Sequence, residues 1–156
     1  MRAGFRKIAL IGGSGKVGRY IPEYAAAQGL QVRMLIRNPA KVSYADSRIE
    51  LIQGDAQNRE SLLETLQGCD VVVNTLGQPE REPNPIYSKV TAELVSVMQE
   101  LDIQRYMGVT GGSLTLEGDR KSLLDRIGAR MFRLLYPVMM EDKAREVRVL
   151  QASSLD

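Results

Sequence analysis

Near its start the chain passes from an apolar run over residues 7–11 directly into a cluster of glycines. Gly12, Gly13, Gly15 and Gly18 fall within seven residues. Glycine permits a tight turn and lets the backbone approach a phosphate without an intervening Cβ, and Gly18 lets the next helix pack closely on its strand. The pattern predicts a strand, a glycine turn and a helix whose N-terminal N–H groups bind the pyrophosphate of a dinucleotide.

The residues after the glycines favour dinucleotide binding over a plain connecting turn. We expect a helix from Val17 to Gln28, ended by Gly29, and a second strand over 31–36, which together complete a β-α-β unit of about thirty residues. A nucleotide-triphosphate loop is excluded, because Lys16 precedes Val17 rather than Ser or Thr. The predicted cofactor-binding residues of this turn are Gly12, Gly13, Ser14, Gly15, Lys16, Val17 and Gly18.

Composition limits the classes of function. We expect a single domain over residues 1–156. The chain has 21 Lys and Arg against 19 Asp and Glu, and this net charge of +2 is too small to indicate binding to a nucleic acid or an anionic membrane. Cys69 is the only cysteine and histidine is absent, so disulfide frameworks, Cys/His metal sites and histidine triads are excluded, and no metal is expected.

No apolar stretch approaches the length of a membrane span, and the chain begins a strand too early to leave room for a leader. We therefore expect a cytoplasmic protein. The most apolar late segment, Met131 to Met140, is interpreted as core or pocket lining rather than a membrane anchor.

Strand and helix signals alternate along the whole chain, which is typical of an α/β fold with a doubly wound parallel sheet, the Rossmann architecture. Further strands are expected over 48–53, 71–75 and 105–109, and helices over 59–66, capped by Asn58, and 86–101. Polar residues follow each strand. Because ligands of such sheets bind at the carboxyl ends of the strands, these residues are predicted to line one crevice.

The end of the second strand bears on the choice of nucleotide. An NAD site usually presents Asp or Glu there, whereas an NADP site presents a cation to the 2′-phosphate. This chain has Arg37, followed by Lys41, and no carboxylate before Asp46. We predict NADP (NADPH) rather than NAD, with Arg37 and Lys41 as ligands; the alternative is that both are ordinary solvated charges.

Several motifs resemble those of a known family: the glycine turn, Ile36-Arg37-Asn38-Pro39, Gln53-Gly54-Asp55, Asp70-Val71-Val72-Val73 and Lys143-Ala144-Arg145-Glu146-Val147. They are similar to the atypical short-chain dehydrogenases/reductases, and within them to NmrA-like and biliverdin-reductase-B-like NAD(P)-binding proteins. The resemblance implies cofactor contacts from Asp55 and Ala56 near the adenine, and from Asn74, Thr75, Leu76 and Gly77 under the ribose and pyrophosphate. Thr110 and Ser113 would approach the nicotinamide. Alternatively, Asp55 only fixes its turn, and Thr110 and Ser113 only satisfy loop backbone.

Many short-chain reductases pair a Tyr with a Lys four residues later, but no tyrosine here has a lysine at that spacing. In isoflavone-type reductases a helix lysine takes the acid–base role, and Lys143 is similar in placement. Lys143, Ser113 and Thr110 are therefore the candidate catalytic residues, with a solvated helix lysine as the alternative for Lys143.

The expected function is an NADPH-dependent reductase that transfers hydride to a small acceptor such as a flavin, quinone or carbonyl compound. Alternatives are a non-catalytic redox sensor of the NmrA-like type and an assembly factor that uses the Met131 to Met140 region as its contact surface. Family members continue past residues 150–156 into another core strand, so the C-terminal part is expected to be missing. A helix ending near Asp156 would then leave an edge open to self-association.

Overall fold

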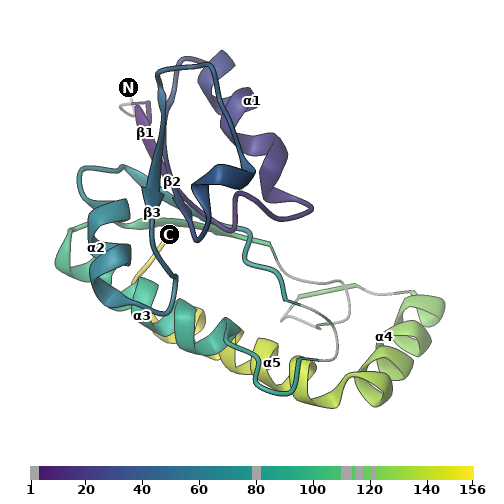
Figure 1. The fold of residues 1–156 in the computed structure, drawn as a ribbon. Coiled ribbons are helices and arrows are strands. Elements are labelled where there is room, and N and C mark those ends of the chain that lie inside the picture. Colours follow the sequence, from purple (N-terminus) through teal and green to yellow (C-terminus); the bar gives the residue numbers. More distant parts are fainter. Residues whose placement is uncertain (1–3, 79–81, 110–113, 115–117, 121) are drawn as a thin grey trace.

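The computed structural model describes residues 4–78, 82–109, 114, 118–120 and 122–156. It contains a parallel sheet in the order β3-β2-β1-β4-β5, made of β1 (Lys7–Ile11), β2 (Gln31–Ile36), β3 (Ile49–Gln53), β4 (Val71–Asn74) and β5 (Arg105–Gly108) (Figure 1). The strand order reverses between β1 and β4, where Ile8 lies opposite Val71. This topology confirms the predicted doubly wound sheet.

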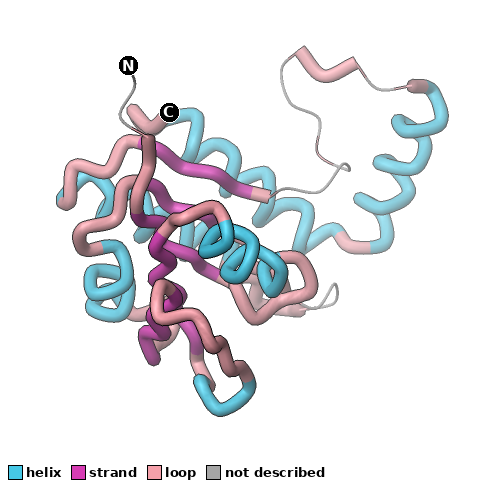
Figure 2. Tube along the Cα trace, turned by 90° about the horizontal axis from the view of Figure 1, so that it is seen from above, coloured by secondary structure: helices cyan, strands magenta, loops and turns pink. Residues whose placement is uncertain are grey.

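Helices cover both faces of the sheet because its buried strands alternate their apolar side chains. From β1, Ile8 and Leu10 pack toward α1 (Ile21–Ala27), whereas Ala9 and Ile11 pack in a second cluster with α2 (Arg59–Leu66) and α3 (Tyr87–Glu100). The tube in Figure 2 shows the strands between these helical layers. Strands buried on both faces read as near-continuous apolar runs, as this sequence does.

Local signals account for most helix boundaries. The Asn58 side chain accepts a hydrogen bond from the Ser61 N–H (2.8 Å) and starts α2, and Gly68 after that helix has a φ of 73°. The first helix is shorter than predicted: a 3-10 turn, η1 (Gly18–Tyr20), precedes α1, which has Pro22 in its first turn and ends at Ala27. Proline suits a first turn because it has no N–H to donate.

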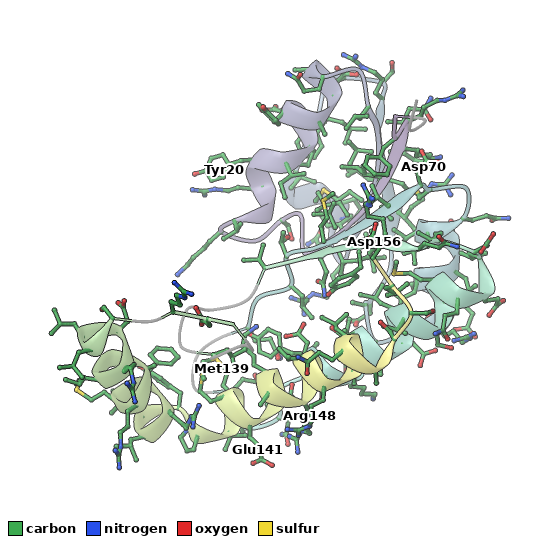
Figure 3. All side chains as sticks on the ribbon, turned by 180° about the vertical axis from the view of Figure 1, so that it is seen from behind. Tyr20, Asp70, Met139, Glu141, Arg148 and Asp156 are labelled. Atoms are coloured by element: carbon green, nitrogen blue, oxygen red, sulfur yellow. The ribbon has the colours of Figure 1, made fainter. Side chains whose placement is uncertain are left out.

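The late apolar segment divides between two helices, α4 (Leu123–Leu135) and α5 (Pro137–Ala152). Met139 and Met140 are buried, and Figure 3 shows Met139 on the opposite side of α5 from Glu141 and Arg148. Met131, by contrast, is 59% exposed on α4. The expectation of core or pocket lining over Met131 to Met140 is therefore right only for its C-terminal part, because the helix breaks between Leu135 and Pro137.

The chain ends beside β5. α5 stops at Ala152 rather than near Asp156, and the Asp156 N–H donates to the Gln104 carbonyl (2.7 Å) while the Tyr106 N–H donates to the Asp156 carbonyl (2.9 Å). Arg105 also pairs with the Asp156 carboxylate (2.7 Å). Asp156 is thus hydrogen-bonded to both chain neighbours of Arg105, which is the pattern of two residues opposite each other in a parallel pair of strands. It therefore pairs with the first residues of β5 through its backbone. Within the described residues no helix has both the length and the apolar character needed to cross a bilayer.

Candidate nucleotide-binding site

The turn after β1 and the segment after β4 are in direct contact on either side of the switch point. Gly12 has a φ of 78°, and a Cβ on it would lie 2.7 Å from backbone atoms of Thr75 and Leu76. The Thr75 N–H and hydroxyl both donate to the Ile11 carbonyl, at 2.9 and 3.0 Å. Only glycine fits at position 12, and the two segments together form one edge of the sheet.

The glycines of the turn have different neighbours. A Cβ on Gly13 would lie 2.7 Å from the side chains of Leu10 and Met34, and one on Gly18 would lie 2.4 Å from the Gly12 carbonyl oxygen and the Thr75 hydroxyl. At Gly15, among the described residues other than its two chain neighbours, only the Gly12 carbonyl oxygen lies within 4 Å of such a Cβ, at 3.1 Å. Gly13 and Gly18 are glycine because the protein is close-packed there, whereas the described residues leave the space in front of Gly15 almost open.

This open space fits the phosphates of a dinucleotide. Ser14, Lys16 and Val17 are exposed, and their backbone N–H groups make no hydrogen bond to another described residue. Unpaired N–H groups beside a glycine without a Cβ form a cradle for an anion. The fit therefore rests on the backbone of the turn, with the Lys16 side chain as an additional positive charge.

Arg37 is exposed at the carboxyl end of β2, and among the described residues it has no acidic partner. The next carboxylate along the chain, Asp46, is bound to Arg48 (2.6 Å), and the hydrogen bonds from Arg48 lower the pKa of Asp46 to about 2. Asp46 is therefore already paired, and Arg37 stays open to an anionic ligand. Lys41 lies in the short 3-10 helix η2 (Pro39–Lys41), and its side chain is outside the described part.

Asp55 and Ala56 follow β3, whose end is tied to β2 by the Gly54 N–H donating to the Ile36 carbonyl (3.0 Å). The Asp55 carboxylate accepts a hydrogen bond from the Gln57 N–H (2.8 Å), and Ala56 packs against the core. Asp55 thus fixes its own turn, as the alternative interpretation expects, while it remains half-buried at the same edge of the sheet as the glycine turn.

The residues after β4 are engaged in shaping the site. The Asn74 side chain is buried; its Oδ1 accepts from the Leu76 N–H (3.0 Å) and its Nδ2 donates to the Tyr106 hydroxyl (2.9 Å). Leu76 packs against the core, and Gly77 is exposed, with no described residue outside its chain neighbours within 4 Å of where a Cβ would be. In this segment the side chains hold the loop, and the backbone of Gly77 is available to a ligand, whereas the Gln78 N–H is bonded to Tyr87.

Lys143 belongs to a polar network that joins α5 to the start of α3. Its side chain is only 13% exposed; its Nζ lies 3.8 Å from the centroid of the Tyr87 ring and 3.5 Å from Glu146 Oε2. The buried Glu146 also accepts a hydrogen bond from the Thr91 hydroxyl (3.0 Å). Lys143 is therefore not an ordinary solvated helix lysine.

Tyr87 connects this network to the strand ends. Its hydroxyl accepts a hydrogen bond from the N–H of Gln78, close after β4 (2.9 Å). Burial raises the pKa of the Tyr87 phenol, and Lys143 lies on the face of the ring rather than beside the hydroxyl. A Tyr–Lys pair of the usual reductase kind lowers a phenol pKa instead, so Tyr87 and Lys143 do not form one.

Tyr87 and Thr91 were not foreseen as neighbours of Lys143 and Glu146, because they lie on α3, about fifty residues before α5, and no local spacing joins the two helices. Glu146 lies three residues after Lys143 on α5, so helical spacing alone brings that pair together, although it was not predicted. The catalytic candidates Thr110 and Ser113 lie outside the described residues. Of the predicted cofactor ligands, the structure brings Gly12 to Gly18 together with Thr75 and Leu76. Asp55 follows Gly54, whose N–H is bonded to the end of β2.

A doubly wound parallel sheet with a glycine turn at its switch point defines a dinucleotide-binding protein of the Rossmann class. A family model described as NAD(P)H-binding matches residues 12–156, and the chain belongs to this NAD(P)H-binding family. The resemblance to atypical short-chain dehydrogenases/reductases is thereby confirmed.

Several known proteins are similar to this chain in sequence or in structure. An isoflavone reductase homolog from Nicotiana tabacum is 39% identical over 80 residues, 46% of this chain and 26% of its own length. The photosystem II assembly factor Ycf39 from Cyanophora paradoxa is 32% identical over 104 residues, 64% of this chain and 32% of its own. A short-chain dehydrogenase/reductase from Veillonella parvula, solved with NADP, has a TM-score of 0.75 at 16% identity, over 98% of this chain and 67% of its own. The chain thus spans about a third or less of the two sequence relatives.

Proposed function

We propose that this chain binds NADPH in preference to NADH and is the nucleotide-binding part of a reductase for a small acceptor such as a flavin, a quinone or a carbonyl compound. The observation that carries the proposal is Arg37, an exposed guanidinium without an acidic partner among the described residues at the end of β2. A guanidinium binds a phosphate through two parallel hydrogen bonds, and no described carboxylate forms an ion pair with Arg37 that the phosphate would have to displace.

The proposed binding site divides by chemistry. The N–H groups of Ser14, Lys16 and Val17 would hold the pyrophosphate, Arg37 the 2′-phosphate, and the backbone at Gly77 the ribose. Asp55 and Ala56 would lie near the adenine, with Thr110 and Ser113 near the nicotinamide. When bound, the reduced nicotinamide supplies the hydride; the protein positions the acceptor and excludes competing reactions.

Lys143 is the proposed proton donor. A lysine holds a proton at Nζ at neutral pH and can give it to an acceptor oxygen as negative charge develops there. Glu146 and the Tyr87 ring restrict the position of this ammonium group, at 3.5 Å and 3.8 Å. An oriented donor transfers its proton more readily than a mobile one, because little orientation remains to be lost in the transition state.

Two measurements test this function. Calorimetric titration is expected to show tighter binding of NADPH than of NADH, and equal affinities would contradict the role of Arg37. Oxidation of NADPH, followed by absorbance against a panel of flavins, quinones and aldehydes, is expected to reveal turnover with at least one acceptor class. Lys143→Met, which removes the proton but keeps the length, should lower the turnover number and leave NADPH affinity unchanged.

A second candidate is a non-catalytic protein that binds NADP(H) and reports its redox state to a partner, or assembles with one. It is favoured by the similarity of 64% of this chain to a photosystem II assembly factor and by the absence of the usual Tyr–Lys pair. Tight NADPH binding without turnover on any acceptor, together with a partner retained only in the presence of nucleotide, would support it over the reductase.

A further inference from the structure

Helix α4 carries an apolar surface that is exposed along its whole length. We call it the α4 apolar face; each of its members is between 54% and 80% exposed: Leu123, Leu124, Ile127, Met131, Leu134 and Leu135. At 3.6 residues per turn these positions fall within an arc of roughly 120°. So wide an apolar stripe normally faces a protein core, yet no described side chain of α4 is buried.

One flank of the α4 apolar face is positively charged. Arg126, Arg130 and Arg133 follow one another at helical spacing along that flank, and none of them forms an ion pair with a described residue. They line a hollow of about 460 Å³ together with Ala129 and Leu134. The acid of this helix, Asp125, is engaged with Ser122 in the N-terminal cap. The flank of α4 is therefore locally cationic, although the net charge of the whole chain is small.

The position of α4 leaves this surface accessible. Figures 1 and 2 both show α4 standing away from the sheet, joined to α5 at one end. Its 13 residues span about 20 Å, too short for the roughly 30 Å hydrocarbon core of a bilayer. A helix with an apolar stripe, a cationic flank and this length suits the plane of a membrane surface rather than a crossing.

We propose that α4 binds parallel to the surface of an anionic lipid bilayer. The α4 apolar face would enter the boundary between headgroups and acyl chains, and the three arginines would extend their apolar stems along the helix to place their guanidinium groups on lipid phosphates. This peripheral contact differs from the anchor that the sequence analysis excluded, because no segment crosses the membrane.

Charge complementarity favours lipid over a second copy of the chain. If two α4 helices paired antiparallel through their apolar faces, the flank with Arg126, Arg130 and Arg133 would face the same flank of the other copy. Like charges in that position repel, and Asp125 is already used in the cap. An anionic bilayer can bury the α4 apolar face and bind the three arginines at the same time.

The chain contains no tryptophan, so a single introduced one reports on its own surroundings. We would place it in the α4 apolar face as Leu124→Trp and, as a matched control, on α1 as Tyr24→Trp; these side chains are 80% and 71% exposed. With vesicles of phosphatidylcholine and phosphatidylglycerol, Leu124→Trp fluorescence should shift to the blue and Tyr24→Trp fluorescence should not. Vesicles of phosphatidylcholine alone should give a much smaller shift.

Replacing Arg126, Arg130 and Arg133 by Gln in the Leu124→Trp background should weaken binding about a hundredfold, while Arg148→Gln on α5 should leave it unchanged. The replaced side chains are exposed, so the substitutions should leave the fold intact, and circular dichroism checks this. No blue shift on anionic vesicles would overturn the proposal, as would unchanged binding of the triple variant. A blue shift without vesicles that grows with protein concentration would also overturn it, in favour of a second copy.

Discussion

Gly15 and Gly18 stand three residues apart in one turn, and the structure gives each a different reason to be glycine. A Cβ on Gly18 would lie 2.4 Å from two atoms of the protein, whereas one on Gly15 would approach a single atom of the other described residues, the Gly12 carbonyl oxygen at 3.1 Å. Gly18 is therefore required by the packing of the turn against Thr75. Gly15 keeps free the space that the proposed nucleotide would fill.

This difference predicts opposite outcomes for two substitutions. Gly15→Val should remove NADPH binding and change the free energy of unfolding little, because its side chain enters mainly ligand volume. Gly18→Ala should lower the free energy of unfolding by about 1–3 kcal/mol, since overpacking forces the turn to shift. Calorimetry and urea unfolding measure the two effects. Native NADPH affinity in Gly15→Val would show that the turn is structural only.

Arg37 is the residue on which the nucleotide preference depends. Arg37→Ala should reduce the preference for NADPH over NADH by about 1.5–3 kcal/mol, the range of a hydrogen bond to a charged group. Arg48→Ala is the matched control, because Arg48 is also exposed but is paired with Asp46, and it should leave the preference unchanged. If both variants behaved alike, Arg37 would be an ordinary solvated charge.

Two elements far apart in sequence, α3 and α5, are joined by buried polar contacts as well as by apolar packing. Asp142 of α5 accepts from the Ser88 N–H and hydroxyl, and one turn further Glu146 accepts from Thr91 and faces Lys143. These contacts fix the register of one helix on the other, because each buried acid must keep its partners.

Glu146→Gln should therefore destabilise the fold by about 1–3 kcal/mol, since it leaves Lys143 nearly buried without its counter-ion. The matched control is Glu141→Gln on the outer side of α5, whose pair with Arg145 is exposed and worth less than about 1 kcal/mol. Thermal unfolding compares the two variants. If they proved equally stable, the Lys143–Glu146 pair would contribute no more than a surface ion pair does.

Asp70 joins the starts of β1 and β4, because its carboxylate accepts hydrogen bonds from the N–H groups of Arg6 and Lys7, both at 2.8 Å. These backbone bonds lower the pKa of Asp70 from its ordinary 3.8. A carboxyl group whose pKa is lower in the folded than in the unfolded state stabilises the fold at pH values above its unfolded-state pKa. This stabilisation is lost as the pH falls through the folded-state pKa. Stability should thus decline below about pH 4, and less steeply in Asp70→Asn. Parallel declines in both proteins would contradict this role.

For the molecule as a whole, β5 is one of the two edge strands of the sheet, with β3 at the other edge. Asp156 pairs with the beginning of that strand, while Met107 and Val109 further along are 47% and 53% exposed. An exposed strand edge can pair with another chain. We expect this chain to associate with itself through the edge of β5 at high concentration.

Light scattering tests this expectation, with two variants that separate the possible surfaces. Met107→Lys places a charge on the edge strand and should reduce association, as charged residues do at natural sheet edges. Met131→Lys places the same charge on the α4 apolar face and should not. A chain that stays monomeric at all concentrations would contradict the prediction.

The sequence by itself determined those features that depend on the geometry of residues close together along the chain. The glycine turn, the Asn58 cap, the strands buried on both faces and the position of Arg37 each depend on residues within about one turn or one strand of one another, so their patterns are visible in the order of residues. Because α/β alternation admits few topologies, the doubly wound sheet followed from the same local signals.

Only the tertiary structure decided which distant groups meet. It brought Tyr87 to Lys143 and Thr91 to Glu146, placed Asp156 in register with Arg105, and left the α4 apolar face exposed although its periodicity resembles that of a core helix. No spacing along the chain encodes such contacts, because they arise from how separate elements pack. Periodicity shows that a helix has an apolar side, but the packing of the remaining elements determines what covers it.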